Sequence, residues 1–336
     1  MKPSTRAAPF MPAVLARIAP RLGAEVWLEP EFREVGRIRF PNGRQTFFWH
    51  NKFNLNSVSS AKIVQDKGYA GFFLQQLGFR VPRTQSFFNH EMSRRLASPR
   101  DLEAGFRFAL ELGLPVFVKP CRRSQGSGIR LVGSRDAYEH AARAIFARDS
   151  MLLVQEPCPG RDYRVVVLDR EVISAYERVP LHVIGDGAAS VRALLLEMQA
   201  EFDRSGRDTE LALDDPRIAA SLARQNLGFD SVLPEGARVT LLEVANLSCG
   251  GSTIDVTASI HPTVAALAVR IAAELDLRLA GVDIMLADAT QSLDDYFVLE
   301  VNSAPGLDHY ASSGPEHEAA IDALYEKVLI AIARGP

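Results

Sequence analysis

A lysine at the end of a short apolar run stands just before a loop of small residues. Lys119 lies in the segment Phe117–Pro120. The small residues of the loop that follows are Ser124, Gly126, Ser127 and Gly128. Such residues let successive backbone N–H groups approach phosphate oxygens, and a lysine adds a point charge on the same group. The spacing matches neither common glycine-rich nucleotide motif, so an ordinary hairpin turn is an equally good interpretation.

Two arginines fall in consecutive segments that we expect to pair as antiparallel strands. Arg164 lies in the segment 162–168, and Arg178 ends the segment 171–178. Two fixed guanidinium groups hold carboxylate or phosphoryl oxygens through paired hydrogen bonds. Asp162 offers an acceptor for ribose hydroxyls. The alternative is a solvated surface charge pair, which is the usual fate of Arg and Asp.

Three side chains with hard oxygen atoms lie in two apolar segments near the end of the sequence. Asp283 is in the first, and Glu300 and Asn302 are in the second. Residues two apart on a strand share a face, so Glu300 and Asn302 point the same way and Asp283 joins them from the neighbouring strand. Two carboxylates and an amide oxygen suit Mg²⁺ or Mn²⁺, whose remaining positions go to phosphates. The alternative is ion pairing with a basic neighbour.

A small polar loop over 246–252 follows a predicted strand and contains Cys249. The loop is suited to cradle a substrate carboxylate or a reaction intermediate. A cysteine among glycines also fits a nucleophile, but the sequence supplies no base for it, and a structural cysteine is the commoner case. The seven histidines show no metal-ligand spacing.

The elements that must position these groups follow from the hydrophobic periodicity. Helices are predicted at Ala13–Ala19, Ala61–Leu77, Ala104–Leu112, Ser134–Ala147, Val191–Asp203, Pro262–Leu275 and His317–Ala333. Strands are predicted in a hairpin over Gly36–Phe48 and at Val116–Lys119, Ile129–Val132, Met151–Gln155, Asp162–Leu168, Glu171–Arg178, Val239–Val244, Gly281–Ala287 and Tyr296–Val301. Strict βαβ alternation is missing, so the pattern predicts an α+β fold and disfavours a doubly wound Rossmann domain.

Composition narrows the class of protein. The 336 residues are 47% hydrophobic and 24% charged, which excludes a mainly disordered chain. A formal net charge of −3 gives no basic excess for nucleic acid or an anionic membrane. No uncharged apolar run reaches the ~18 residues of a membrane span. Three widely spaced cysteines form no pair, so we expect a cytoplasmic location.

Taken in order, these segments resemble the ATP-grasp ligases, in particular the ATP-grasp part of the cyanophycin synthetases and a similar domain in the bifunctional glutathione synthetases. The resemblance covers about residues 60–310. The matching stretches are Phe117–Pro120, Pro159–Arg164, Arg178–Pro180, Val183–Gly187, Asn246–Gly251, Ile254–Thr257, His261–Pro262, Gly281–Asp283 and Glu300–Leu307.

The resemblance implies two α+β subdomains that clasp ATP between them. It also implies a reaction in which ATP, a carboxylate and an amine give an amide, ADP and phosphate. Carried over to this chain, it implies an ATP site made by Lys119, Ser124, Gly126, Ser127, Gly128, Gln155 or Glu156, and Asp162; a Mg²⁺ site made by Asp283, Glu300 and Asn302; and an acyl-phosphate site made by Arg178, Arg164 and Asn246.

The chain departs from the resembling sequences mainly on the acceptor side. Cys249 replaces a usual threonine, and Leu242 stands where the cyanophycin enzymes lead us to expect a basic residue. Cyanophycin is therefore a poor guess for the substrate, and a small amino acid or peptide-like acceptor is the better prediction.

We expect three parts in the chain. These are a short N-terminal extension (1–55), an ATP-grasp N-terminal part (56–160) with a nucleotide lid at about 115–156, and a C-terminal part (161–335) with the metal and substrate site. The predicted function is an ADP-forming carboxylate–amine ligase with small-molecule substrates and neither nucleic acid nor membrane as partner; a homo-oligomer is left open. The alternatives are an ATP-grasp phosphotransferase, a non-catalytic nucleotide-binding module, and a peptide-tailoring enzyme that recognises its substrate through residues 1–55.

Overall fold

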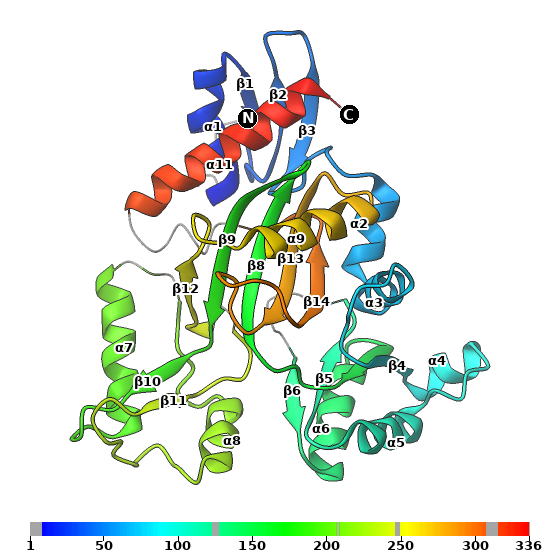
Figure 1. Ribbon diagram of the computed structural model, residues 1–336, viewed down its shortest axis with the longest axis vertical. Helices are drawn as coiled ribbons and strands as arrows, with labels where there is room; N and C mark the ends of the chain where they lie inside the picture. Colours follow the sequence, from blue (N-terminus) through cyan, green and yellow to red (C-terminus); the bar gives the residue numbers. More distant parts are fainter. Residues whose placement is uncertain are drawn as a thin grey trace.

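Antiparallel pairing organises the molecule. The computed structural model describes residues 9–122, 128–205, 207, 209–245, 249–306 and 315–335 (Figure 1). Within these residues the strands form sheets of five, four, three and two strands, and each pairing is antiparallel. The prediction of a mixed α+β chain without a doubly wound sheet is confirmed.

The five-stranded sheet has the order β12-β9-β8-β13-β14. Its strands are β8 (Arg161–Leu168), β9 (Glu171–Val179), β12 (Ser252–Asp255), β13 (Leu279–Leu286) and β14 (Tyr296–Asn302). Val165 and Val167 of β8 belong to an apolar cluster with α9 (Pro262–Glu274) on one face of the sheet. Val166 and Leu168 belong to a second cluster on the opposite face. Burial on both faces explains the continuous apolar run of this strand.

The opposite face of the same sheet changes from apolar to charged along the strands. Arg164 lies two residues before Val166 on β8, and Asp283 lies four residues after Leu279 on β13. Because side chains alternate between faces, these charged groups continue the face to which Val166 and Leu279 belong. One end of that face is therefore part of the hydrophobic core, and the other end carries the charged residues of a candidate site.

The four-stranded sheet has the order β4-β7-β5-β6. Its strands are β4 (Thr84–Phe88), β5 (Val116–Pro120), β6 (Arg130–Val132) and β7 (Met151–Gln155), with the short helix α4 (His90–Arg95) after β4. Val116, Val118 and Val154 form a cluster with α5 (Leu102–Leu112) and α6 (Arg135–Phe146). Lys119 and Gln155 have the opposite alternation and face away from these helices.

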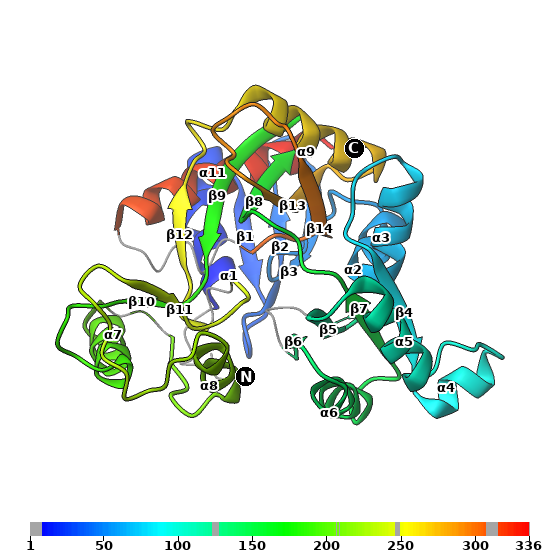
Figure 2. The same ribbon diagram turned by 60° about the horizontal axis from the view of Figure 1, so that its bottom comes forward.

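A small unit inserted after β9 has a core of its own. It comprises β10 (His182–Ile184), α7 (Val191–Ser205), α8 (Pro216–Arg224) and β11 (Arg238–Thr240). The strand predicted at 239–244 is thus shorter and starts one residue earlier, and α8 was not predicted, although its buried Ile218 and Leu222 have helical spacing. Asp215 starts α8, since its carboxylate accepts a hydrogen bond from the Arg217 N–H at 2.8 Å. Figure 2 shows this unit and the four-stranded sheet on opposite sides, beyond one end of the five-stranded sheet.

The helix predicted at 61–77 is two helices, α2 (Val58–Gln65) and α3 (Lys67–Gln76). The break falls at Asp66, whose carboxylate accepts hydrogen bonds from the N–H groups of Gly68 and Tyr69. An aspartate that caps a new helix competes with continuation of the preceding helix. The apolar periodicity of the sequence therefore continues across Asp66, although the helix itself is interrupted there.

Residues 9–55 are more regular than the sequence predicted. They form α1 (Phe10–Ile18), a 3₁₀ turn (Ala19–Leu22) and a sheet of β1 (Glu25–Leu28), β2 (Val35–Arg39) and β3 (Gln45–Trp49). Figure 1 shows α11 (Pro315–Arg334) beside α1, at the same end of the molecule as this sheet. The cluster on Val166 and Leu168 includes side chains from α1, from β2 and from α11. The segment therefore shares a core with the five-stranded sheet, and the domain boundaries given above stay predictions.

Candidate functional site

Two arginines and two aspartates interlock on the charged face of the five-stranded sheet. The register places Asp162 opposite Arg178, and Asp283 opposite Arg164. Arg178 Nη2 lies 2.7 Å from Asp162 Oδ1 and 2.9 Å from Asp283 Oδ2. Arg164 donates to both oxygens of Asp283 through Nε and Nη2. The expected antiparallel placement of the two arginines is confirmed.

The two aspartates of this cluster have opposite electrostatic character. Burial acts to raise the pKa of Asp283, but Arg164 and Arg178 outweigh it and hold that pKa below its ordinary value. Burial raises the pKa of Asp162, against the opposing effect of Arg178 and with the support of the neighbouring Asp283 carboxylate. Asp283 is therefore the firmly ionised anchor of both guanidinium groups.

One hydrogen-bond donor of Arg178 is unsatisfied among the described residues. Its Nε atom is buried and has no hydrogen-bond partner among the described residues. A buried donor of this kind costs free energy unless an acceptor arrives. The arrangement is suited to an oxygen of a bound carboxylate or phosphoryl group.

Glu300 and Asn302 lie on the same face at the edge strand β14. Glu300 pairs across the strands with Asp283, and Asn302 pairs with Gly281. With its amide oriented to satisfy both of its groups, Asn302 donates to Glu300 Oε1 at 3.0 Å and accepts from Arg164 Nη2 at 3.1 Å. The three oxygen-bearing residues are thus neighbours, as predicted. Their carboxylates also form ion pairs with basic side chains, which was the alternative interpretation.

Lys67 is a charged group of this region that the sequence interpretation missed. Its Nζ lies 3.2 Å from Glu300 Oε2, and its side chain is only 11% exposed. The position of Lys67 is the feature of the sequence that could have indicated a role, because a positive charge in the first turn of a helix is unfavourable in the field of the helix dipole. Lys67 follows the cap residue of α3 directly, so its place there calls for a partner elsewhere.

Lys119 is buried on the inner face of the four-stranded sheet. Its Nζ donates to Gln155 Oε1 at 2.7 Å. Burial, with a smaller contribution from Lys67, lowers the pKa of Lys119 to about 8. Gln155 also donates to the Thr84 hydroxyl at 2.8 Å, while Glu156 accepts from the Arg83 N–H at 2.8 Å. Both candidate readers of adenine are thus already bonded within the four-stranded sheet region.

A cavity of about 990 Å³ connects these lysines with the edge of the five-stranded sheet. Its polar lining includes Lys67, Lys119, Gln155 and Glu300. Its apolar lining comes from α3, β4, α5 and β7, and includes Phe72, Phe73, Phe88, Phe108 and Met151. A polar end and an apolar wall suit a ligand with a charged tail and a flat apolar head. Asp162, Arg164 and Arg178 do not line it, so the structure places Asp162 in the arginine cluster.

Several predicted site residues lie outside the described part of the chain. These are Ser124, Gly126, Ser127 and Asn246. Gly128 is described and adopts a positive φ of 81°, which favours glycine. Cys249 is half-buried, and Arg217 Nη2 lies 3.8 Å from its sulfur. An arginine is no general base, so nothing here supports a nucleophilic Cys249.

The described residues contain no group of three or more His, Cys, Asp and Glu side chains arranged to hold a metal ion. The candidate set Asp283, Glu300 and Asn302 differs from such a group because its third donor is an amide. The three cysteines are free. Among the helices of the described ranges, none is both long enough and apolar enough to cross a bilayer.

Two family models match separate parts of the chain. Residues 73–187 match the C-terminal part of D-ala D-ala ligase, and residues 243–323 match the RimK-like ATP-grasp domain. The first match contains Lys119, Arg164 and Arg178, and the second contains Asp283 and Glu300.

Curated relatives cover most of this chain but only part of their own length. Cyanophycin synthetase of Geminocystis herdmanii is 32% identical over 266 residues, which are 76% of this chain and 29% of the relative. Cyanophycin synthetase of Nostoc sp. is 36% identical over 202 residues, 58% of this chain and 22% of the relative. The glutathione biosynthesis bifunctional protein GshAB of Listeria innocua is 28% identical over 263 residues, 76% of this chain and 33% of the relative. The chain thus spans about a third or less of the relatives it matches.

One solved structure covers nearly the whole chain. The bifunctional glutathione synthetase from Pasteurella multocida aligns with a TM-score of 0.58 at 24% identity. The alignment covers 94% of this chain and 44% of that one.

Proposed function

We propose, for a chain that belongs to the ATP-grasp family, an ATP-dependent, ADP-forming ligase activity that joins a carboxylate to an amine. The predicted α+β ATP-grasp fold is confirmed. The substrates proposed are an amino acid or short peptide on each side of the new amide bond. A cytoplasmic location is part of the proposal, supported by three free cysteines.

The chemistry needs an activated carboxylate. One carboxylate oxygen attacks the γ-phosphorus of ATP and ADP leaves, so that an acyl phosphate forms. The amine then attacks the acyl carbon, the bond to the phosphate oxygen breaks, and the amide and phosphate are released. The protein contributes mainly positioning and charge neutralisation to such transfers.

The observation that carries the proposal is the unsatisfied Nε of Arg178 beside the clamped Asp283. Arg178 Nη2 already contacts two carboxylates, so the orientation of the guanidinium group is fixed before any substrate binds. The free Nε would donate to an oxygen of the acyl phosphate. Arg164, held through two atoms by Asp283, adds a second fixed positive charge.

The residues present fit Mg²⁺, because carboxylate and amide oxygens are the ligands this ion prefers. Glu300 and Asn302 would hold it, with Asp283 contributing from the adjacent strand. Bound Mg²⁺ would neutralise negative charge on the β- and γ-phosphates. Lys119 and Lys67 would contact the phosphates from the cavity side, and Lys67 would exchange its Glu300 partner for them.

Isotope transfer tests the reaction. The substrate carboxylate is labelled with oxygen-18, and ADP release is screened against pairs of amino acids with mass detection of products. One labelled oxygen should appear in the released phosphate, and hydroxylamine should intercept the acyl group as a hydroxamate. If the released phosphate never carries the label, no acyl phosphate forms, and the phosphotransferase alternative replaces the ligase proposal.

Arg178→Ala tests the residue assignment in the same assay. Hydroxamate formation should fall far more than ATP affinity, because Arg178 lines the acyl-phosphate position and not the nucleotide cavity. Arg170→Ala, an exposed residue in the turn between the same two strands, is the matched control and should behave as wild type. Equal losses in the two variants would remove Arg178 from the reaction.

A further inference from the structure

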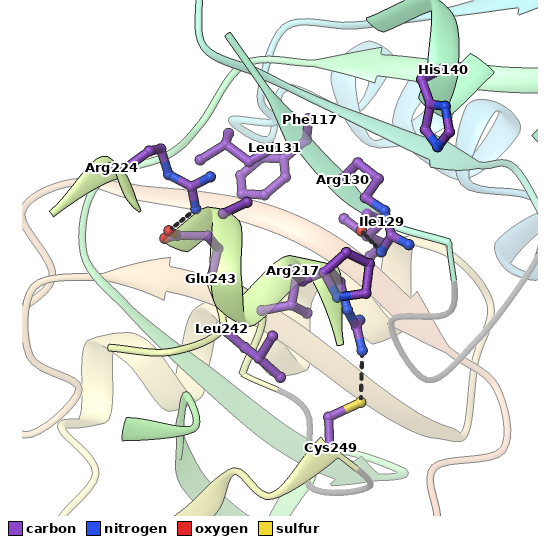
Figure 3. A pocket seen from close by; sticks show the side chains of 13 residues that line it. Phe117, Ile129, Arg130, Leu131, His140, Arg217, Arg224, Leu242, Glu243 and Cys249 are labelled. Carbon is purple, nitrogen blue, oxygen red and sulfur yellow. Dashed lines mark hydrogen bonds and ion pairs between the residues drawn. The ribbon is translucent and has the colours of Figure 1, made fainter. Parts of the chain in front are cut away.

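A second, smaller cavity of about 160 Å³ lies where the four-stranded sheet meets the inserted unit. One wall comes from β5, β6 and α6, and the other comes from α8, from residues 242–244 and from Cys249. Figure 3 shows Phe117, Ile129, Leu131 and Leu242 among its apolar side chains, with Arg224 turned toward Glu243 and Arg217 turned toward Cys249. At roughly 30 Å³ for each water-sized group, it accommodates about five non-hydrogen atoms.

The charges that line this cavity do not balance. Arg217 is held by Asp215, with Nε–Oδ2 at 2.8 Å and Nη2–Oδ2 at 2.5 Å. Arg224 is held by Glu243, with Nη2–Oε1 at 2.5 Å. Arg130 forms no ion pair with any described residue, and its Nη1 makes only a long contact with the Ile129 carbonyl, at 3.4 Å. The cavity therefore carries one positive charge in excess.

Arg130 is poorly compensated in electrostatic terms as well. Burial and then the neighbouring Arg217 lower the pKa of Arg130, while Asp215 only partly offsets them. His140 also lines the cavity and adds no negative charge. An anion beside Arg130 would relieve both the burial of a charge and its repulsion from Arg217.

The position of the cavity ties it to the proposed reaction. Phe117 is two residues from Lys119 on β5 and shares its face of the sheet. Cys249, in the loop predicted to line the acyl-phosphate site, closes the opposite wall, where it accepts a contact from Arg217. A substrate bound here would therefore lie between the strand that carries Lys119 and the segment that contains Cys249.

We propose that this cavity binds a second carboxylate of a substrate, one that does not react, with Arg130 as its charge partner. The inference rests on the proposed ligase function and names its substrate class. One substrate carries an acidic side chain of the size of glutamate or aspartate. The apolar walls receive its methylene groups, and Arg130 receives its carboxylate through paired hydrogen bonds.

Binding tests the proposal independently of turnover. The probes are glutarate and its uncharged isostere glutaramide, titrated by calorimetry into the wild type and into Arg130→Gln. Glutarate should bind the wild type about ten- to a hundredfold more tightly than Arg130→Gln, the worth of one charged hydrogen-bonded contact. Arg130→Lys should recover part of the affinity, which shows that the charge matters and not a collapsed fold. Arg107→Gln, an exposed arginine on α5, is the matched control and should equal the wild type.

Two outcomes overturn the proposal: equal glutarate affinity in wild type and Arg130→Gln, or equal binding of glutarate and glutaramide. Arg178→Ala is included because glutarate could also occupy the arginine cluster. The difference between wild type and Arg130→Gln should persist in that background.

Turnover separates this inference from the proposed function. Among amino-acid substrates, glutamate or aspartate should give faster ADP release than glutamine or asparagine, and Arg130→Gln should remove that preference. Ligase turnover without any such preference contradicts the inference and leaves the function standing. Arg130-dependent glutarate binding without oxygen-18 transfer contradicts the function and leaves the acidic site standing.

Discussion

Arg178 holds two carboxylates whose pKa values move in opposite directions. Asp283 stays ionised because two guanidinium groups outweigh its burial, whereas the pKa of Asp162 is raised by burial despite Arg178. Asp283 therefore fixes both arginines, and Asp162 is the carboxylate more easily neutralised. At the residue scale, Asp283 thus holds Arg164 and Arg178 in place before any substrate binds.

The first prediction concerns Lys119 and pH. Its pKa of about 8 lies below the ordinary 10.5, so the amine loses its charge above pH 8 in the nucleotide-free protein. Phosphates favour the charged form, and ATP binding should therefore take up a proton and weaken by up to about tenfold per pH unit above 8. Calorimetry at pH 7, 8 and 9 in two buffers of different ionisation enthalpy measures both effects.

Lys119→Arg is the control, because arginine keeps its charge through pH 9. Its ATP affinity should be flat over this range. The lowered pKa of Lys119 also makes stability depend on pH. The buried charge costs stability below pH 8, and the free energy of unfolding should rise as pH increases from 8 toward 10.5. Wild-type ATP affinity that does not change between pH 7 and 9 contradicts the prediction.

The second prediction concerns Glu300. Glu300→Gln removes one charge and almost no volume, so the fold should persist while Mg²⁺-dependent ADP release falls by at least about a hundredfold. The variant also frees Lys67 from its ion pair. Titration of Mg²⁺ against ADP release gives the result. Glu171→Gln, at an exposed pair with Lys327, should leave the titration unchanged, and near-normal release in Glu300→Gln would refute the metal assignment.

At the scale of elements, the break at Asp66 positions the cavity that we propose binds the nucleotide. It starts α3, which places Lys67 against Glu300 and lines one wall of the cavity. Asp66 also accepts from Arg122 Nε at 3.1 Å and from the Cys121 thiol at 3.2 Å. One buried carboxylate thus joins the helix, the end of β5 and the cavity.

The third prediction follows from this junction. Asp66→Ala should lower the free energy of unfolding by about 1–3 kcal/mol, since it removes a helix cap and a charged hydrogen bond. ATP affinity should also fall because Lys67 loses its fixed place. Asp66→Asn keeps the capping oxygen and should recover much of the stability in urea unfolding. Equal unfolding midpoints for wild type and Asp66→Ala would show that the break in the helix does not depend on this cap.

Sequence patterns predicted the features that depend only on residues close together in the chain. The spacing of Glu300 and Asn302 fixes their common face, and the apolar runs of β8 and β13 fix a buried sheet. The position of Lys67 was not predicted, because apolar periodicity continues through Asp66. The pairing of Gln155 with Lys119 and the excess charge at Arg130 were not predicted either, since both depend on strands brought together by the tertiary fold.

At the scale of the whole molecule, α1 and α11 pack together and share one core with the five-stranded sheet. Arg17 of α1 and Arg21 of the 3₁₀ turn that follows it both contact Asp322 of α11, at 2.6 and 2.9 Å. Further pairs to Glu318 and Glu326 surround them. Residues 9–55 therefore stabilise the face of the sheet that carries the site farther along its strands.

The fourth prediction tests this coupling. Asp322→Ala should lower the free energy of unfolding by about 1–2 kcal/mol, because the carboxylate is largely buried and its loss leaves two arginines without a shared partner. Glu318→Ala, at an exposed pair, should change it by only a few tenths of a kcal/mol. Thermal and urea unfolding give both values. A cost for Asp322→Ala no larger than for Glu318→Ala would mean that the pairing between α1 and α11 is only peripheral.

The contact between α1 and α11 also has a consequence for the folding of the chain during translation. The two helices lie about 300 residues apart in the chain. Translation at roughly 5–20 residues per second leaves α1 without this partner for ~15–60 s. During that interval its apolar face, which ends up buried with Ile321 and Leu329, is open to chaperones and to neighbouring nascent chains. The packing of α1 is thus completed only after α11 has been made.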